Sequence, residues 1–316
     1  MVTSSFRFST GNLPLHARGK ALHELRDRGV LPLEPLPGCE VDVRIAKWFL
    51  PGAGVLSGSL CGVRQDAGPR TPDAGDDLFF GVNVTGGSTA IQRGRRIALG
   101  DGDAILLSCD AGPFTILRPG PVRFLGLRVP RKTLGPLIAS FDDASVRFIP
   151  GQTDALRLLS TYVSAATNID VLASAEIAHL VATHLHDLIA LSVGATRDAA
   201  VAAEGRGVRA ARLQAIKSDV SANLGDESLS LAGVAARHHV TPRYVHKLFE
   251  GEGITYSQFV LRQRLDGAYR RLRDPRFAAR SISWIAYEAG VGDLSYFNRA
   301  FRRRYHATPS DVRNER

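Results

Sequence analysis

Arginine, lysine, asparagine, serine and histidine side chains recur at helical spacing in two segments near the C-terminus. They are Arg243, His246 and Lys247 in the first segment, and Ser295, Asn298, Arg299 and Arg302 in the second. Steps of three and four residues place such side chains on one face of a helix. Guanidinium and ammonium groups suit guanine O6 and N7, and an amide suits adenine N6 and N7. The residue types are therefore suited to contact with nucleic acid.

The positive charge of the chain is concentrated in the same region. The formal net charge is +9, and residues 1–205 hold 20 basic and 20 acidic side chains, whereas residues 206–316 hold 20 basic and 11 acidic ones. Positive charge gathered in one part of a chain is typical of a nucleic-acid-binding domain. A basic surface that only aids solubility would have the same composition.

A helix-turn-helix motif is predicted to hold the first polar segment. A helix following Ser230 breaks at 238–240, and a second helix begins at Pro242, because Thr241 is a good N-cap and proline suits the first helical position. The apolar side of this second helix carries Val245, Leu248 and Phe249. The polar residues then point outward.

The same arrangement recurs about fifty residues later. Ser281 caps one helix, Gly290 permits a turn, and Asp293 caps the next helix, whose apolar side carries Leu294, Phe297 and Phe301. A long helix over roughly 257–273 separates the two motifs. Two helix-turn-helix motifs in tandem are a more specific signal for DNA binding than one.

The residues of the second motif also carry a family resemblance. They include the Ile-Ala pair 285–286, Gly290, the runs Ser-Tyr-Phe 295–297 and Arg-Ala-Phe 299–301, and Pro309 followed by Arg313. On these residues, the region 208–313 resembles the DNA-binding domain of the AraC/XylS family of transcriptional regulators. Val291 stands where the family usually has phenylalanine, and His306 where it usually has glycine. Both departures put local packing in question more than function.

The resemblance implies that two recognition helices enter successive major-groove segments on one face of DNA. The candidate base readers are then Arg243, His246, Lys247, Ser295, Asn298 and Arg299. The adjacent arginines are expected to neutralise phosphates, which gives affinity without sequence information; they are Arg302, Arg303 and Arg304. For any one of these residues, contact with phosphate or solvent alone is the alternative.

The first two hundred residues are predicted to form an antiparallel β structure followed by helices. Short β-type runs separated by Gly, Pro and Asp turns lie at 41–45, 78–84, 104–108, 114–117 and 122–127, a pattern typical of a sandwich or barrel. The segment from Asp76 to Asp103 resembles the cupin-like sensor half found in one branch of the same family. Such domains usually bind a small effector inside the barrel and dimerise through helices.

Two amphipathic helices are expected within 152–193. Their apolar stripes make them candidates for a dimer interface, with Leu156, Leu159, Val163, Val181, Leu185 and Leu188 as the candidate contact residues. The following segment loses this periodicity and ends in two glycines around Arg206, so we expect a flexible linker there.

The residue types give little support to the hypothesis that the chain is an enzyme. The predicted barrel, residues 38–133, contains no histidine, which argues against a cupin-type metalloenzyme. His179, His184 and His186 are better explained as core or interface residues than as metal ligands.

Arg93, Arg95 and Arg96 either bind an acidic effector or form a charged hairpin tip, and the second interpretation is favoured. Cys39, Cys61 and Cys109 have no spacing that suggests disulfides or a metal cluster, and we expect them to be buried.

The sequence therefore predicts an α+β chain with two domains and a linker. Residues 1–195 are expected to form a cupin-like antiparallel β-barrel with flanking helices, and residues 196–207 the linker. Residues 208–316 are expected to form an all-α domain with two helix-turn-helix motifs joined by a long helix.

The expected function is that of a cytoplasmic, effector-responsive transcriptional regulator, an activator rather than a repressor, without catalytic chemistry, metal or cofactor. Its expected partners are double-stranded DNA, RNA polymerase, a small organic effector and a second copy of the chain, and no membrane. A constitutive DNA-binding regulator whose first domain only dimerises is the alternative, and a cupin-type metalloenzyme fused to a DNA-binding domain is a remote one.

Overall fold

The computed structural model describes residues 5–68, 77–139, 146–167, 174–226 and 228–314. The chain divides into two compact units, 1–211 and 212–316. Asp76, the first residue of the sensor-like segment, lies outside the described residues. Within the described part of the chain, no helix combines the length and the apolar character needed to cross a lipid bilayer.

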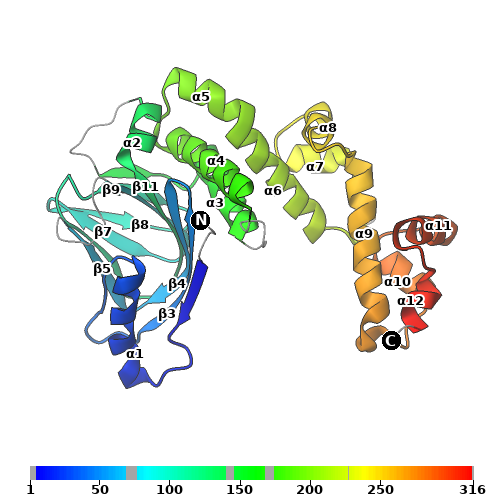
Figure 1. The fold of residues 1–316 in the computed structure, drawn as a ribbon, viewed down its shortest axis with the longest axis horizontal. Coiled ribbons are helices and arrows are strands. Elements are labelled where there is room, and N and C mark those ends of the chain that lie inside the picture. Colours follow the sequence, from blue (N-terminus) through cyan, green and yellow to red (C-terminus); the bar gives the residue numbers. More distant parts are fainter. Residues whose placement is uncertain (1–4, 69–76, 140–145, 168–173, 227, 315–316) are drawn as a thin grey trace. The chain divides into compact units, whose positions relative to one another are not determined.

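Two antiparallel sheets form the body of the first unit (Figure 1). The seven-stranded sheet has the order β1 (Ser5–Ser9), β3 (Asp42–Leu50), β4 (Ala53–Cys61), β11 (Val122–Pro130), β6 (Asp77–Thr85), β9 (Ala104–Ser108) and β12 (Arg147–Ile149). The five-stranded sheet has the order β2 (Leu33–Pro35), β5 (Val63–Ala67), β10 (Phe114–Arg118), β7 (Ser88–Gln92) and β8 (Arg95–Leu99). All five predicted strands are confirmed. The sheets remain separate in the hydrogen-bonding pattern, so the predicted barrel is not closed.

The seven-stranded sheet is apolar on both faces. In β9, Ala104 and Leu106 pack in a core with the following helices, whereas Ile105 and Leu107 pack in a core with the five-stranded sheet. This assignment follows from the alternation of side chains along a strand. Because both faces are covered, the strand reads as a continuous apolar run.

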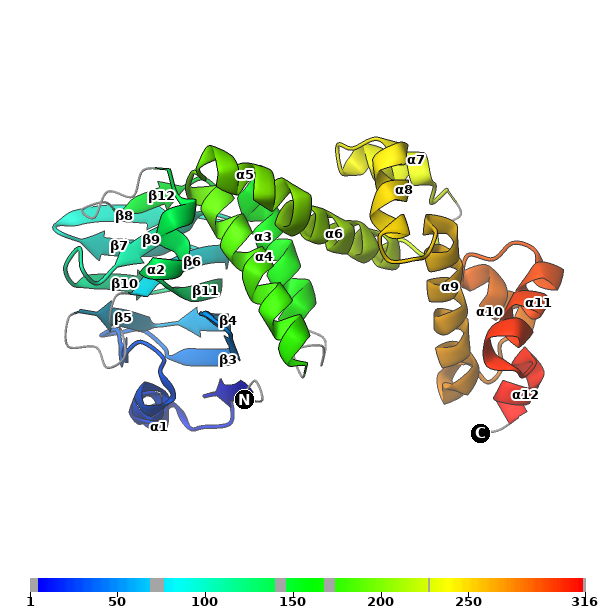
Figure 2. The same ribbon diagram turned by 45° about the horizontal axis from the view of Figure 1, so that its top comes forward.

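Helices cover one face of this sheet (Figure 2). The helices of the first unit begin with α1 (Leu15–Ala21), a 3-10 helix (Leu22–Arg28) and α2 (Arg131–Leu134), and continue with α3 (Asp154–Thr167), α4 (Ala175–Val193), α5 (Arg197–Ala203), a π-helix (Glu204–Val208) and the start of α6 (Arg209–Ala222). The helical pair predicted within 152–193 is therefore present as α3 and α4.

The segment predicted as a flexible linker is helical instead. Residues 197–208 form α5 and the π-helix, and Ala203 and Val208 are buried. Arg206 holds the segment to α4 through two hydrogen bonds to the Asp187 carboxylate, at 2.7 and 3.0 Å. Two glycines and the absence of an apolar stripe pointed to a linker, but helix formation here is supported by contacts with α4.

The second unit consists of helices arranged around α9 (Tyr256–Arg273). The others are α7 (Leu231–Arg237), α8 (Pro242–Glu250), a 3-10 helix (Pro275–Phe277), α10 (Ile282–Glu288), α11 (Leu294–Tyr305) and α12 (Pro309–Asn314). The N-terminal half of α9 packs in one core with α7, α8 and the part of α6 that belongs to this unit, and its C-terminal half packs in a second core with α10, α11 and α12. Both predicted helix-turn-helix motifs and their spacer helix are confirmed.

The two motifs are built from the same local devices. Thr241, Ser281 and Asp293 each accept a hydrogen bond from a backbone N–H in the first turn of their helix. In the turns, the Val240 N–H donates to Ala235 O and the Val291 N–H to Ala286 O, both at 3.0 Å. These bonds require a left-handed residue before the valine, and the sequence supplies His239 (φ 53°) and Gly290 (φ 80°).

The two departures from the family pattern are accommodated. Val291 is buried in the core of the second motif. His306 ends α11 in the left-handed conformation, with φ 56°, where its N–H donates to Arg302 O. Of the three cysteines, only Cys109 is buried, so the expectation of burial fails for Cys39 and Cys61.

Gly290→Ala should destabilise the second unit, because alanine is strained at a left-handed φ by about 1–2 kcal/mol. The added Cβ would also lie 2.5 Å from Leu224 O and 2.7 Å from Arg264 Nε. Urea unfolding followed by Trp284 fluorescence, in a Trp48→Phe background, measures the change. Gly292→Ala is the control: its Cβ meets no atom within 4 Å, so we expect a change within about 0.5 kcal/mol. Equal losses from both substitutions would contradict the role given to the turn.

Candidate DNA interface and effector pocket

The predicted face of α8 is exposed. Arg243, His246 and Lys247 are on the surface, while Val245, Leu248 and Phe249 on the opposite side are buried. The three polar side chains line an open hollow together with Thr241, Tyr244 and Glu250. Arg212 lies 5.7 Å from the centre of the Tyr244 ring, which adds a further cation near this surface. Helix α8 thus presents cationic and aromatic side chains at the surface, where DNA could contact them.

The corresponding face of α11 is also exposed. Ser295, Asn298 and Arg299 are on the surface, and Phe297, Ala300 and Phe301 face the core. Arg299 lines a second hollow with Arg302, Arg303 and His306. Tyr296 at the start of the helix is 42% exposed. The exposure of this aromatic ring was not predicted, because a tyrosine next to an apolar helix position is usually expected in the core.

Arg304 differs from the two arginines before it. Its guanidinium donates to both oxygens of the Asp266 carboxylate on α9, at 2.7 and 3.1 Å from Nη2. The Tyr305 hydroxyl donates to the same carboxylate. A bidentate ion pair within the unit occupies the donors that a phosphate would need. The structure thus gives Arg304 the role of joining α11 to α9, where the sequence suggested contact with phosphate.

The turn of the first motif contains a charged network rather than a reactive site. Asp219 on α6 accepts from Arg237 at 2.9 Å and lies 3.2 Å from His238 Nε2. These bonds join the end of α7 to α6, so His238 helps to hold the two helices together.

The six residues predicted to form a dimer interface are buried within their own unit. Leu156, Leu159, Val163, Val181, Leu185 and Leu188 all pack in the core between α3, α4 and the seven-stranded sheet. None of the six is on the surface, so the prediction that these residues form the dimer interface is wrong. The large apolar side chains of α4 that are exposed are Ile177 and Leu180 instead.

The histidines of α4 are hydrogen-bonded core residues where they are buried. His184 Nδ1 lies 2.8 Å from the Tyr162 hydroxyl, and His186 Nε2 lies 3.0 Å from Gly52 O. Burial lowers the pKa of both histidines below the usual value. Within the described ranges, no group of three or more His, Cys, Asp or Glu residues could hold a metal ion.

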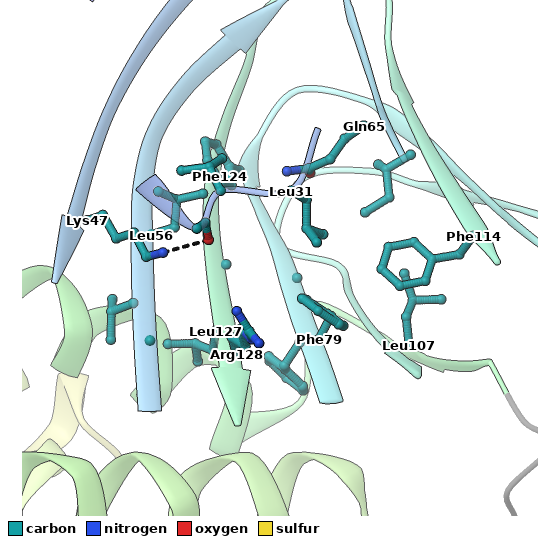
Figure 3. A pocket seen from close by; sticks show the side chains of 18 of the residues that line it. Leu31, Lys47, Leu56, Gln65, Phe79, Leu107, Phe114, Phe124, Leu127 and Arg128 are labelled. Atoms are coloured by element: carbon teal, nitrogen blue, oxygen red, sulfur yellow. Dashed lines mark hydrogen bonds between the residues drawn. The ribbon is translucent and has the colours of Figure 1, made fainter. Parts of the chain in front are cut away.

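A pocket lies inside the first unit, between the two sheets (Figure 3). Its walls are mostly apolar and aromatic, and include Leu31, Leu56, Phe79, Leu107, Phe114, Phe124 and Leu127. Its polar members are Lys47, Gln65, Arg118 and Arg128. Concave apolar sites with a few polar groups are typical of small-molecule pockets. Arg93, Arg95 and Arg96 are exposed at the β7–β8 hairpin and do not line it.

Arg118 is the unusual residue of this pocket. It is 4% exposed, its Nη1 donates to Gln65 Oε1 at 3.1 Å, and its guanidinium lies 5.2 Å from the centre of the Phe124 ring. Burial lowers its pKa to about 10, so it remains charged at neutral pH. The sequence contained a signal that was missed: in β10, the buried positions alternate through Phe114 and Ile116 to Arg118.

Comparisons with known proteins agree with these two units. Residues 32–193 match the family described as AraC-binding-like domain, and residues 234–315 match the helix-turn-helix domain family.

Two relatives and one solved structure illustrate the similarity. The transcriptional activator NphR of Rhodococcus sp. is 30% identical over 235 residues, which cover 73% of this chain and 68% of NphR. The transcriptional activator RhrA of Rhizobium meliloti (strain 1021) is 47% identical over 102 residues, so the chain spans 32% of the length of that relative. The crystal structure of the AraC-like transcriptional activator CuxR aligns with 90% of this chain and 100% of that chain, at 14% identity and a TM-score of 0.48.

The match to the AraC-binding-like domain covers half of the chain, and NphR is similar across both units. The chain belongs to the AraC family of DNA-binding transcriptional regulators, with an AraC-binding-like domain followed by a helix-turn-helix domain.

Proposed function

We propose that the chain is a transcriptional activator that reads two adjacent major-groove segments through α8 and α11. The observation that carries this proposal is that two exposed polar helix faces belong to motifs packed on one helix, α9. The proposed base readers remain Arg243, His246, Lys247, Ser295, Asn298 and Arg299. Arg302 and Arg303 are proposed to contact phosphates, and Arg304 is left out because Asp266 engages it.

The proposed partners follow from this activity. Double-stranded operator DNA is the first, and RNA polymerase is the second because the relatives NphR and RhrA are named activators. Such a protein would act where the DNA lies, which is the cytoplasm in the bacteria that contain these relatives. The apolar pocket of the first unit supports a small organic effector as the third partner.

We further propose a homodimer formed through the outer side of α4. Ile177 and Leu180 lie one turn apart on this helix, and Leu180 is 54% exposed. Neighbouring apolar side chains at a three-residue step form a stripe that water solvates poorly. An isologous contact of two such stripes would pair the DNA-binding units.

Arg299→Ala should reduce binding to cognate DNA by about 1–3 kcal/mol and leave binding to random DNA nearly unchanged, if the arginine reads a base. The cognate site is one selected from random DNA by the wild-type chain, and fluorescence anisotropy gives both affinities.

Arg303→Ala is the matched comparison on the same helix. Loss of a phosphate contact should weaken cognate and random DNA alike and reduce the salt dependence of log K by about one. If Arg299→Ala behaves in this way too, its assignment as a base reader is wrong.

Leu180→Asp should yield monomers in sedimentation velocity, because a carboxylate on the stripe would be buried in the interface. Val201→Asp is the control, since Val201 is 71% exposed and lies outside α4. A dimer that survives Leu180→Asp, or one that is lost equally in Val201→Asp, would place the interface elsewhere.

A further inference from the structure

The pocket between the two sheets contains a buried cation, Arg118, that has no anionic partner among the residues the structure describes. No carboxylate among the described residues forms an ion pair with Arg118, and its Nε has no hydrogen-bond acceptor although it is buried. Gln65 and the face of Phe124 interact with the guanidinium, but both are uncharged. A buried charge without a counter-ion is costly for the folded state.

The other two cations of the pocket already have partners. Lys47 Nζ donates to the carbonyl oxygens of Arg28 and Gly29, at 3.0 and 2.6 Å, and the bond to Gly29 lies at the pocket wall (Figure 3). Arg128 forms an ion pair with Asp77. Arg118 is therefore the pocket cation whose charge and whose N–H donor are both unmatched within the described residues.

We infer that this pocket binds a small organic monoanion, a carboxylate with an apolar body, and that Arg118 holds the carboxylate. The inference rests on the proposed function, because it names the chemical class of the effector. A carboxylate oxygen would supply the missing acceptor for Nε and the missing charge, in the charge-assisted bond that arginine forms best.

The remainder of the pocket defines the rest of the ligand. Phe79, Phe114 and Phe124 provide aromatic walls, and Leu31, Leu107 and Ile116 add aliphatic ones. Such walls match an aromatic or branched hydrocarbon body and offer little to the hydroxyl groups of a sugar. Arg118 offers one positive charge that no carboxylate among the described residues balances, so we expect one carboxylate on the ligand.

The test compares acids with their uncharged amides, which have nearly the same shape. Thermal unfolding of the full chain is measured with 3-phenylpropanoate, 4-methylpentanoate and cyclohexanecarboxylate, each at millimolar concentration, and with the corresponding primary amides. We expect at least one acid to raise the Tm of the first unit, and its amide to bind at least about tenfold more weakly by calorimetry, as for loss of a hydrogen bond to a charged group.

Arg118→Met removes the charge and keeps an unbranched apolar side chain. We expect this variant to be at least as stable as the wild type without ligand, because a buried unpaired charge is lost, and to lose the response to the acid. Arg96→Met is the control, since Arg96 is exposed at a hairpin outside the pocket; it should respond as the wild type does.

The outcomes separate this inference from the proposed function. Equal stabilisation by acids and amides would leave an effector pocket in place but overturn the anionic ligand. An Arg118→Met variant that is less stable than the wild type and still responds to the acid would make Arg118 a structural residue. If none of the acids stabilises the wild type, the inference fails, while specific binding to a selected DNA site, measured on the same sample, decides the DNA-binding function independently.

Discussion

The burial of α9 in two separate cores is the interaction on which the DNA-binding surface depends. Tyr256, Phe259 and Val260 belong to the core of the first motif, and Leu265, Ala268 and Leu272 to that of the second. The helix has 18 residues and a length of about 27 Å. The pair of Asp266 with Arg304 joins α11 to this helix. The exposed faces of α8 and α11 are thereby positioned by packing that does not involve DNA.

The first unit follows a different physical constraint, namely two apolar faces on one sheet. The helices α3 and α4 cover one face and the five-stranded sheet lies over the other. This arrangement places the apolar stripes of both helices in the core, and only a small part of α4 remains to meet another chain. Between the sheets, the same apolar surroundings make the charge of Arg118 costly, because no carboxylate in the described part of the chain pairs with it. An anionic effector would therefore gain affinity there.

Helix caps and turns could be predicted from the sequence, but the partners that side chains contact in the folded structure could not. The caps at Thr241, Ser281 and Asp293, the turn at Gly290 and the spacer helix act within a few residues, so their sequence signals are complete. An apolar stripe indicates burial but does not name the covering surface, which explains the error over the six residues assigned to dimerisation. Arg304 and Arg206 likewise depend on carboxylates far away in the sequence, Asp266 and Asp187.

Hydroxyl-radical footprinting of the full chain on its selected DNA site reports both the spacing and the face of the protein–DNA contacts, and it therefore tests whether α9 sets the distance between the two recognition helices. We expect two protected segments per half-site, about 10 base pairs apart and on the same face of the duplex. Polar substitution of Leu265 and Ala268, which would separate α9 from the second core, should remove one of these segments and leave the other. A single protected segment for the wild type, or two segments on opposite faces, would contradict the role of α9 as the spacer between two reading helices.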